Sequence, residues 1–307
     1  MSRLAAMSRL ATMSRLAAMR VGVVIATKGR PELVARVVAA LSEQTAPPDA
    51  VIISVSDPAD APEVSGGNVI VARSRSGLCA QRNVGIEVLG DAVDVIVFFD
   101  DDFVPSYYWL ESARELFASA PDIVAATGRV LADGIKTAGL SWDEATHLVA
   151  RQDRTPALRT SRVEDGVLPY GCNMAFRRAA VGELRFDERL VLYGWQEDTD
   201  FGARIAARGR TVRSDALYGV HLGLKAGRTS GRRLGYSQIV NPRYLVAKGS
   251  MPASRAITLA TGNFAANVAR ALYPESYIDR AGRLHGNLIA LSDLVTGRWR
   301  PERAAEL

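Results

Sequence analysis

The stretch Val95-Ile-Val-Phe-Phe-Asp100-Asp-Asp102 decides the fold. Its five apolar residues are β-branched or aromatic, which predicts a buried strand. Three carboxylates follow directly, and Pro105 helps to end the strand. Adjacent acids repel one another and are costly when unpaired, so we expect a cation beside them. Mn²⁺ or Mg²⁺ that bridges to a phosphate-bearing ligand fits best, and a solvated acidic turn is the alternative.

The chain before this stretch predicts alternating strands and helices. Residues 21–26 and 51–55 read as short buried strands. Between them a helix begins at Pro31, with apolar residues at spacings of three and four. A strand at 69–71 and a helix at 77–89 lead to the central strand. This order predicts a parallel sheet that binds ligands at the carboxyl ends of its strands.

The chain after the three acids is harder to interpret. A helix is expected at 107–118 and a strand at 123–127, whereas residues 129–168 show weak periodicity and are typical of a mobile or functional segment. An ordered pattern resumes at Tyr170. A further helix opens within 194–200 and stops at Gly209, and a strand then delivers His221.

Charge is distributed unevenly along the 307 residues. Residues 202–307 carry 17 Lys/Arg against 6 Asp/Glu, whereas residues 1–201 carry 21 against 27. A basic C-terminal third predicts an anionic partner, such as a membrane surface, a phosphorylated lipid or nucleic acid. No motif for nucleic-acid binding accompanies it, so nucleic acid is not expected. A merely solvated basic face is the alternative.

The C-terminal third is expected to be helical. A flexible basic loop at 223–235 precedes three predicted helices, at 236–248, 254–273 and 277–295. The middle helix could pack on the domain or lie on a membrane. Packing is favoured because the polar face of this helix is only weakly basic.

Other features bound the class of protein. Residues 1–18 repeat the hexamer MSRLAA with one change, and we expect this repeat to be disordered. The folded parts are then 19–222 and a helical extension at 223–307. Two cysteines, Cys79 and Cys172, offer no disulfide framework or metal-ligand spacing, which predicts a reduced, cytoplasmic protein. The sequence contains no run of 18 or more apolar residues, so no transmembrane helix is predicted.

Five motifs, in their order and spacing, resemble the family 2 glycosyltransferases of the GT-A fold, especially bacterial enzymes of polysaccharide synthesis. The resemblance covers about residues 20–222. It rests on VVIATKGRP at 23–31, GLCAQRNVG at 77–85, FDDD at 99–102, GCNM at 171–174 and GWQEDTD at 194–200. It implies an α/β fold with a GT-A-type nucleotide-binding sheet, mixed and mainly parallel, flanked by helices and followed by a C-terminal helical extension.

The implied reaction moves a sugar, with inversion, from a nucleoside diphosphate sugar to an acceptor hydroxyl on a lipid-linked or polysaccharide intermediate. The resemblance places the first strand end in the nucleotide pocket, and Asp57 at the base or ribose unless it is only an Asp-Pro turn residue. Gln81 departs from the family's Ala-Arg-Asn-x-Gly helix start, and Arg82 could instead be a surface cation. The implied donor-binding set is Ala26, Thr27, Arg30, Asp57, Arg82, Asn83, Asp100, Asp101, Gly171 and Asn173.

The family's Asp-x-Asp motif maps onto Asp100 and Asp102. Asp102 would coordinate Mn²⁺ or Mg²⁺ directly, and Asp100 would contact the ribose or a metal-bound water. Asp101 is the alternative direct ligand. His221 would complete the metal site, although a lone histidine at a strand end can also be structural. A metal there would neutralise the diphosphate and stabilise it as a leaving group.

The second acidic cluster meets the other need of the reaction. An acceptor hydroxyl must lose its proton as it attacks, and a nearby carboxylate can accept it. The resemblance assigns this role to Asp198, with Glu197 orienting the acceptor or the base. Capping of the helix by Thr199 or Asp198 is the alternative, and for Asp200 stabilisation of the helix dipole from the first turn is the strong alternative. Trp195 would be a platform for an acceptor sugar, or simply a core aromatic.

Two other functions stay open at this stage. A nucleotidyltransferase uses a related sheet, but it would lack the Glu-Asp pair and would carry a more glycine-rich loop after the first strand. An inactive glycan- or lipid-binding module on the same fold would not need both acidic clusters. We therefore predict a glycosyltransferase that is cytoplasmic and peripheral at the inner membrane face. Its donor specificity should depend on residues 129–168 and 170–174.

Overall fold

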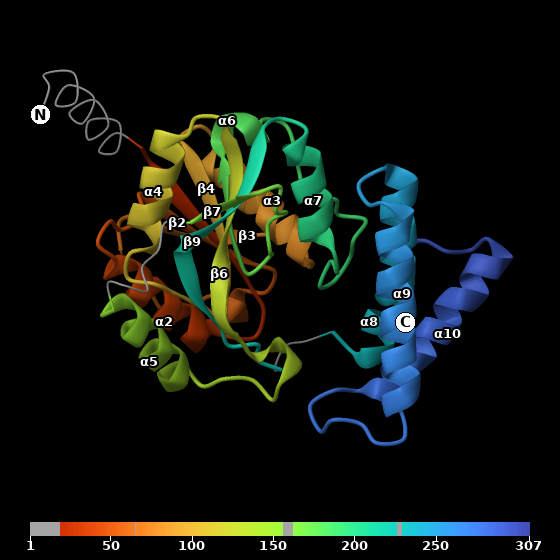
Figure 1. Ribbon diagram of the computed structural model, residues 1–307. Helices are drawn as coiled ribbons and strands as arrows, with labels where there is room; N and C mark the ends of the chain where they lie inside the picture. Colours follow the sequence, from red (N-terminus) through yellow and green to blue (C-terminus); the bar gives the residue numbers. More distant parts are fainter. Residues whose placement is uncertain (1–18, 65, 156–161, 226–228) are drawn as a thin grey trace, which may run out of the picture.

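The computed structural model describes residues 19–64, 66–155, 162–225 and 229–307, so the repeat at 1–18 lies outside the described residues. The described strands form one nine-stranded sheet in the order β3-β2-β1-β4-β8-β6-β9-β5, with β7 also paired to β9 (Figure 1). The strands are β1 (Val21–Thr27), β2 (Ala50–Val55), β3 (Val69–Arg73), β4 (Val95–Asp100), β5 (Phe103–Pro105), β6 (Ile123–Asp133), β7 (Val163–Asp165), β8 (Asn173–Arg177) and β9 (Arg210–His221).

The sheet is mixed and mainly parallel, which confirms the prediction. Strands β1 to β4 are mutually parallel, and β8 runs antiparallel between β4 and β6. Strand β9 is parallel to β6 and antiparallel to β5 and β7. Strands β4 and β9 therefore run in the same direction. Their carboxyl ends, Asp100 and His221, lie at the same edge of the sheet.

Helices cover both faces of the sheet, which explains the uninterrupted apolar character of its central strands. Helices α2 (Pro31–Ser42) and α4 (Trp109–Ser119) pack on the face that includes Val23. Helices α3 (Leu78–Leu89), α6 (Arg178–Val181) and α7 (Glu197–Ala206) cover the face that includes Val24. Helix α3 approaches β1 so closely that a Cβ on Gly85 would lie 2.2 Å from the Val24 side chain.

The described parts of the segment 129–168, which are residues 129–155 and 162–168, are more regular than the sequence suggested. Strand β6 continues to Asp133, beyond the predicted end at 127, because its outer half still pairs with β9 while it is only half-buried. A short 3₁₀ turn at Gly134–Lys136 follows. Helix α5 (Trp142–Asp153) then starts with a capping box formed by Ser141 and Glu144. Half-burial weakens the apolar pattern on which the sequence interpretation relied.

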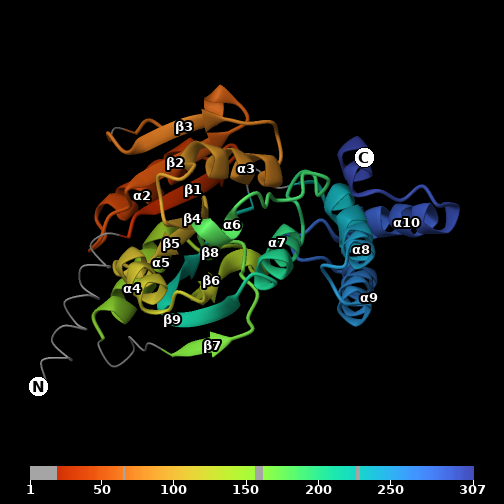
Figure 2. The same ribbon diagram turned by 90° about the horizontal axis from the view of Figure 1, so that it is seen from above.

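The C-terminal third forms helices α8 (Gly231–Lys248), α9 (Ala253–Arg270) and α10 (Arg280–Thr296), which lie together beyond α7 (Figure 2). The predicted loop at 223–235 was too long, because α8 begins at Gly231. Glycine looked like a loop signal here, but it serves packing: a Cβ on Gly235 would lie 2.1 Å from the Arg283 carbonyl oxygen of α10. Among the described residues, no helix is both long and apolar enough to cross a bilayer.

Candidate functional site

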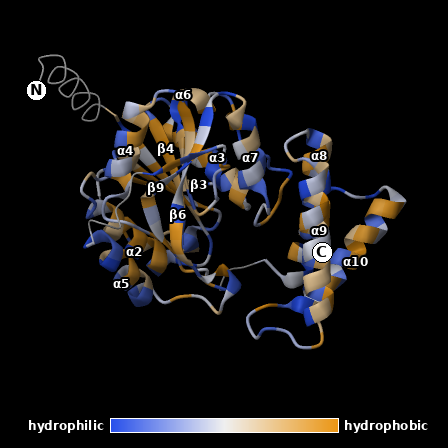
Figure 3. Cartoon of the chain, in the orientation of Figure 1, coloured by the Kyte–Doolittle hydropathy of each residue, from blue (hydrophilic) through white to orange (hydrophobic). Residues whose placement is uncertain are grey.

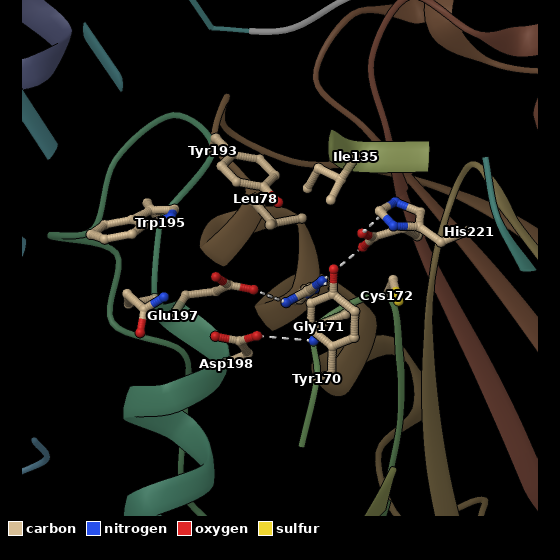
Figure 4. Close-up of a pocket in the computed structure, with 13 residues that line it drawn as sticks. Leu78, Ile135, Tyr170, Gly171, Cys172, Tyr193, Trp195, Glu197, Asp198 and His221 are labelled. Atoms are coloured by element: carbon tan, nitrogen blue, oxygen red, sulfur yellow. Dashed lines mark hydrogen bonds and ion pairs between the residues drawn. The ribbon is translucent and has the colours of Figure 1, made fainter. Parts of the chain in front are cut away.

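A pocket of about 190 Å³ opens where β4 and β9 end and α7 begins (Figure 4). It combines the two acidic clusters that the sequence singled out, although they are about a hundred residues apart. Strand ends supply one side, and the turn before α7 supplies the other. Its lining is formed by Leu78, Arg82, Asp100, Ile135, Tyr170, Gly171, Cys172, Tyr193, Trp195, Gln196, Glu197, Asp198 and His221.

Three side chains at this edge can hold a metal ion. The ligand atoms of Asp100, Asp102 and His221 all lie within 4.8 Å of one another. The Nε2 atom of His221 is 3.2 Å from Asp102 Oδ1 and 4.0 Å from Asp100 Oδ2. Two carboxylates and one imidazole suit Mn²⁺, and Mg²⁺ also accepts carboxylate oxygens. These three metal-ligating side chains therefore fit the divalent ion that the sequence predicted.

Asp101, between the two candidate ligands, has other partners. It accepts hydrogen bonds from Thr27 Oγ1 at 2.8 Å and from Arg30 Nη1 at 2.6 Å. Burial raises the pKa of Asp101 to about 6, although the Arg30 charge opposes this shift. Its carboxylate thus ties β4 to the start of α2. Thr27 and Arg30, predicted in the nucleotide pocket, reach the site through this contact and do not line the pocket.

Asp102 faces His221 and the chain beyond it. Its carboxylate also accepts a hydrogen bond from the Leu224 backbone amide at 2.9 Å. Burial would raise the pKa of Asp102, but the hydrogen bond and charge of His221 outweigh burial and lower it. Asp102 is thus held ionised, which is the form that binds a cation.

His221 has a second carboxylate partner, Asp133, that the sequence interpretation missed. The Nδ1 atom of His221 is 2.8 Å from Asp133 Oδ1, and Tyr170 donates to Asp133 Oδ2 at 2.9 Å. Burial lowers the pKa of His221, but Asp102 and Asp133 outweigh it and raise the pKa to about 10. A carboxylate on the far nitrogen is the usual way in which a metal-binding histidine is oriented.

Arg82 connects the two acidic clusters. The residue is 2% exposed, so the alternative of a surface cation is wrong. Its guanidinium forms ion pairs with Glu197 and, at 3.0 Å, with Asp100. It also donates to the Gly171 carbonyl oxygen at 2.9 Å. One buried cation therefore holds the end of β4, the turn before β8 and the start of α7 together.

Glu197 and Asp198 open α7 and face the pocket (Figure 4). Asp198 Oδ2 accepts from the Gly171 amide at 3.0 Å, and its Oδ1 accepts from the Thr199 amide at 2.7 Å. Burial raises the pKa of Asp198, and it raises that of Glu197 to about 8, where the Asp198 charge adds to the shift and Arg82 opposes it. Asp198 thus both contacts the first turn of the helix and lines the pocket.

The turn before α7 presents aromatic side chains to the pocket. Tyr193 and Trp195 both line it, and two non-glycine residues of this turn, Leu192 and Gln196, have positive φ values of 61° and 74°. Such backbone costs about 1 to 3 kcal/mol per residue and persists only when its surroundings hold it. One such hold comes from α8, where Asn241 donates to the Trp195 carbonyl oxygen at 2.9 Å.

A second link from α8 reaches the buried carboxylate of Asp200. This residue lies in the first turn of α7, where stabilisation of the helix dipole was the alternative, and it also pairs with Arg204 and with Lys248 of α8, both at 2.8 Å. Lys248 also contacts Asp187 at 2.6 Å. Helix α8 therefore fixes both the turn and the helix that carry the second acidic cluster.

Several predicted donor-binding residues lie outside the pocket lining. The buried amide of Asn83 accepts from the Phe186 amide at 2.8 Å and donates to its carbonyl oxygen at 3.0 Å. Asn173 accepts from the Gly128 amide at 2.8 Å. Both arrangements brace the chain. Their donor roles, like that of Ala26, stay predictions.

The side chains of Asp57 and Gln81 form hydrogen bonds with nearby backbone atoms. Asp57 accepts from the Ala59 amide at 2.9 Å and so forms the Asp-Pro turn that was its alternative reading. Gln81, the departure from the family pattern, donates to the carbonyl oxygens of Thr27 and Ser54, both at 2.7 Å. Glutamine there joins α3 to the ends of β1 and β2 in place of the close contact that alanine would allow.

Two solved structures are similar to this chain. A mannosyltransferase, PcManGT from Pyrobaculum calidifontis in complex with GDP-Man and Mn²⁺, has 16% identity and a TM-score of 0.52, over 93% of this chain and 82% of that one. S. aureus TarS 1–349 in complex with UDP-GlcNAc has 13% identity and a TM-score of 0.46, over 91% of this chain and 93% of that one. No curated protein sequence matches the chain.

The first of these likenesses supports the fold alone. The family rests on the sequence itself, because the model of glycosyl transferase family 2 matches residues 22–185, which is more than half of the chain. That match includes four of the five motifs in full, among them the Asp-rich strand end, and part of the site described above. The resemblance predicted from those motifs is confirmed, and the chain belongs to glycosyl transferase family 2.

Proposed function

We propose that the protein is a metal-dependent, inverting glycosyltransferase that uses a nucleoside diphosphate sugar. One observation carries the proposal: a metal-type group of two carboxylates and an imidazole adjoins the pocket that Asp198 lines, and Arg82 bridges the two sides. Sugar transfer needs stabilisation of the leaving group and removal of a proton from the acceptor. Candidate residues for both tasks thus lie at the same pocket. A similar fold carries GDP-Man and Mn²⁺ in PcManGT, which supports this donor class.

Asp102 and His221 would hold the ion, with Asp100 beside them as a third ligand or as the partner of the donor ribose. Asp102 is preferred over Asp101 because its Oδ1 lies 3.2 Å from His221 Nε2, whereas both oxygens of Asp101 accept hydrogen bonds from Thr27 and Arg30. When bound, the divalent ion neutralises the diphosphate and stabilises it as a leaving group. The remaining steps belong to side chains on the other wall of the pocket.

Asp198 would act as the general base. The acceptor oxygen attacks the anomeric carbon as the bond to the diphosphate oxygen breaks, and the hydroxyl proton passes to the Asp198 carboxylate. Attack opposite the leaving group inverts the anomeric configuration. The raised pKa of Asp198 makes it a stronger base than an exposed aspartate. Glu197, fixed by Arg82, would orient the acceptor.

The acceptor would stack on the aromatic side chains of the turn before α7. Trp195 and Tyr193 line the pocket on the Asp198 side, and aromatic faces suit the apolar faces of sugar rings. We propose a lipid-linked or polysaccharide intermediate as the acceptor, and a peripheral position at the cytoplasmic face of a membrane. The cytoplasmic location is supported by Cys79 and Cys172, which are both free and buried.

The donor and the metal can be tested together by thermal shift. Nucleoside diphosphates with Mn²⁺ should raise the melting temperature, because a ligand that binds only the folded state stabilises it by about 2.7 kcal/mol at a hundredfold excess over its Kd. The matching base should give the largest shift. The Asp102→Asn variant should lose the part of the melting-temperature shift that depends on Mn²⁺. Equal shifts with and without Mn²⁺ would remove the metal from the proposal.

Asp133 should matter for metal binding without touching the ion. Asp133→Asn keeps the size of the side chain but replaces the carboxylate that holds His221 Nδ1. We expect Mn²⁺ affinity, measured by electron paramagnetic resonance of free Mn²⁺, to fall by about 10- to 100-fold. Asp165→Asn, on the exposed strand β7, is the control and should bind Mn²⁺ normally. Normal affinity in Asp133→Asn would show that the His221 contact is only structural.

A further inference from the structure

The outward face of α10 carries a row of apolar side chains. Leu284, Leu288, Leu291 and Val295 recur at intervals of four, three and four residues, so they lie along one side of the helix. Leu288 is 52% exposed, and Val295 is 88% exposed. The opposite side, which includes Gly286, is buried against α8. The row therefore does not take part in the packing that holds α10 in place.

Helix α9 and the turn after it add to this apolar surface. Leu272 and Tyr273, just past the end of α9, are 84% and 87% exposed. Seven of the fourteen large apolar side chains that are exposed among the described residues lie between positions 257 and 295. Figure 3 shows apolar residues along both helices, outside the core of the sheet. Such a concentration marks an interaction surface, whereas scattered single residues would not.

Cations outnumber acids in the part of the chain that carries this surface. Residues 229–307 contain eleven Lys/Arg and five Asp/Glu. The acids are occupied locally: Asp293 pairs with Arg303, Glu275 with Arg280, and the others serve caps or nearby arginines. The Arg298 side chain, beside the end of α10, is 66% exposed. Because a second copy of the chain would set cations against cations, an anionic partner is favoured.

We propose that the turn after α9 and helix α10 form a lipid-docking surface, made of Leu272, Tyr273, Leu284, Leu288, Leu291 and Val295, which binds an anionic membrane. The apolar row enters the interface, and the surrounding arginines contact anionic headgroups. Helix α8 joins this surface to the pocket, since it packs on α10 and its Asn241 and Lys248 hold the turn and helix of the second acidic cluster. The proposal rests on the proposed function only where it brings a lipid-linked acceptor to that pocket.

Vesicle flotation of the full chain tests the surface. Phosphatidylcholine vesicles with phosphatidylglycerol should float the protein at low salt, and pure phosphatidylcholine vesicles should not. The double variant Leu288→Glu/Leu291→Glu should bind at least about tenfold more weakly. Arg298→Glu should weaken binding and reduce its salt dependence. Val88→Glu, at an exposed apolar position on α3, is the matched control and should float like the wild type.

Other outcomes overturn the proposal. Equal flotation of the wild type and the double variant would place lipid binding elsewhere in the chain. Absence of flotation, together with a concentration-dependent dimer in sedimentation velocity that the double variant abolishes, would assign the surface to a second copy. Donor hydrolysis measured without vesicles keeps the two proposals apart. Hydrolysis without flotation sinks only the docking surface, and flotation without hydrolysis sinks only the transferase.

Discussion

Replacing Asp198 with Asn is expected to lower kcat for sugar transfer by about 10²- to 10⁴-fold, the usual contribution of a positioned general base. The amide oxygen can still accept the hydrogen bond from the Gly171 amide, so the turn should keep its geometry. The amide cannot take up the acceptor proton. Donor affinity, measured by calorimetry with Mn²⁺, should change by only about threefold, because the metal group stays intact.

A second Asp→Asn change separates catalysis from capping. Asp143 occupies the first turn of α5, away from the pocket, so Asp143→Asn removes a helix-terminal charge of the same kind. It should cost about 0.3 to 1 kcal/mol of stability and leave kcat unchanged. If Asp198→Asn lost only a similar amount of stability and still transferred sugar at the wild-type rate, the base would have to be another residue.

Replacing Arg82 with Met is expected to destabilise the protein by about 3 to 5 kcal/mol, the usual effect of removing one partner from a buried ion pair. The change leaves Glu197 and Asp100 facing each other without the cation between them. It also leaves the Gly171 carbonyl oxygen without its donor. Chemical denaturation at 25 °C would measure the loss as a lower midpoint with an unchanged slope.

A double variant tests the reason for that loss. Arg82→Met/Glu197→Gln removes one of the stranded charges and should recover part of the lost stability. Arg75→Met is the surface control, since Arg75 pairs with Glu188 but its side chain is 83% exposed. Its cost should stay within about 1 kcal/mol. An Arg82 variant as mild as this control would mean that water reaches the cluster and relieves its charge.

The parallel half of the sheet and the principal acids could be predicted because each has a strong local signal. Strands buried on both faces become continuous β-branched runs, and glycine at position 85 marks the close approach of α3 to Val24. The position of the three aspartates after such a strand was enough to suggest a cation site. The two halves of the pocket could be joined only through the family resemblance, because no local pattern relates Asp100 to Asp198.

The contacts that the sequence interpretation missed are long-range. Asp133 lies on the half-buried part of β6, where no motif surrounds it, and its role depends on pairing with His221 across the sheet. Asn83 belongs to the recognised motif, yet its amide bonds Phe186 more than a hundred positions later. Gly235 looked like a loop signal because tight helix packing and loop flexibility both favour a residue without a side chain.

The position of β9 has a consequence for the chain as it leaves the ribosome. Of the described strands, β9 is the last to be synthesised, yet it lies inside the sheet, between β6 and β5, and it ends at His221. The earlier strands can assemble first, but β6 remains an open edge until β9 arrives. A polypeptide released before residue 221 would carry Asp100 and Asp102 without His221. Its strand β6 would also lack the hydrogen-bonding partner that β9 provides. Such truncated products are expected to aggregate before they can bind metal.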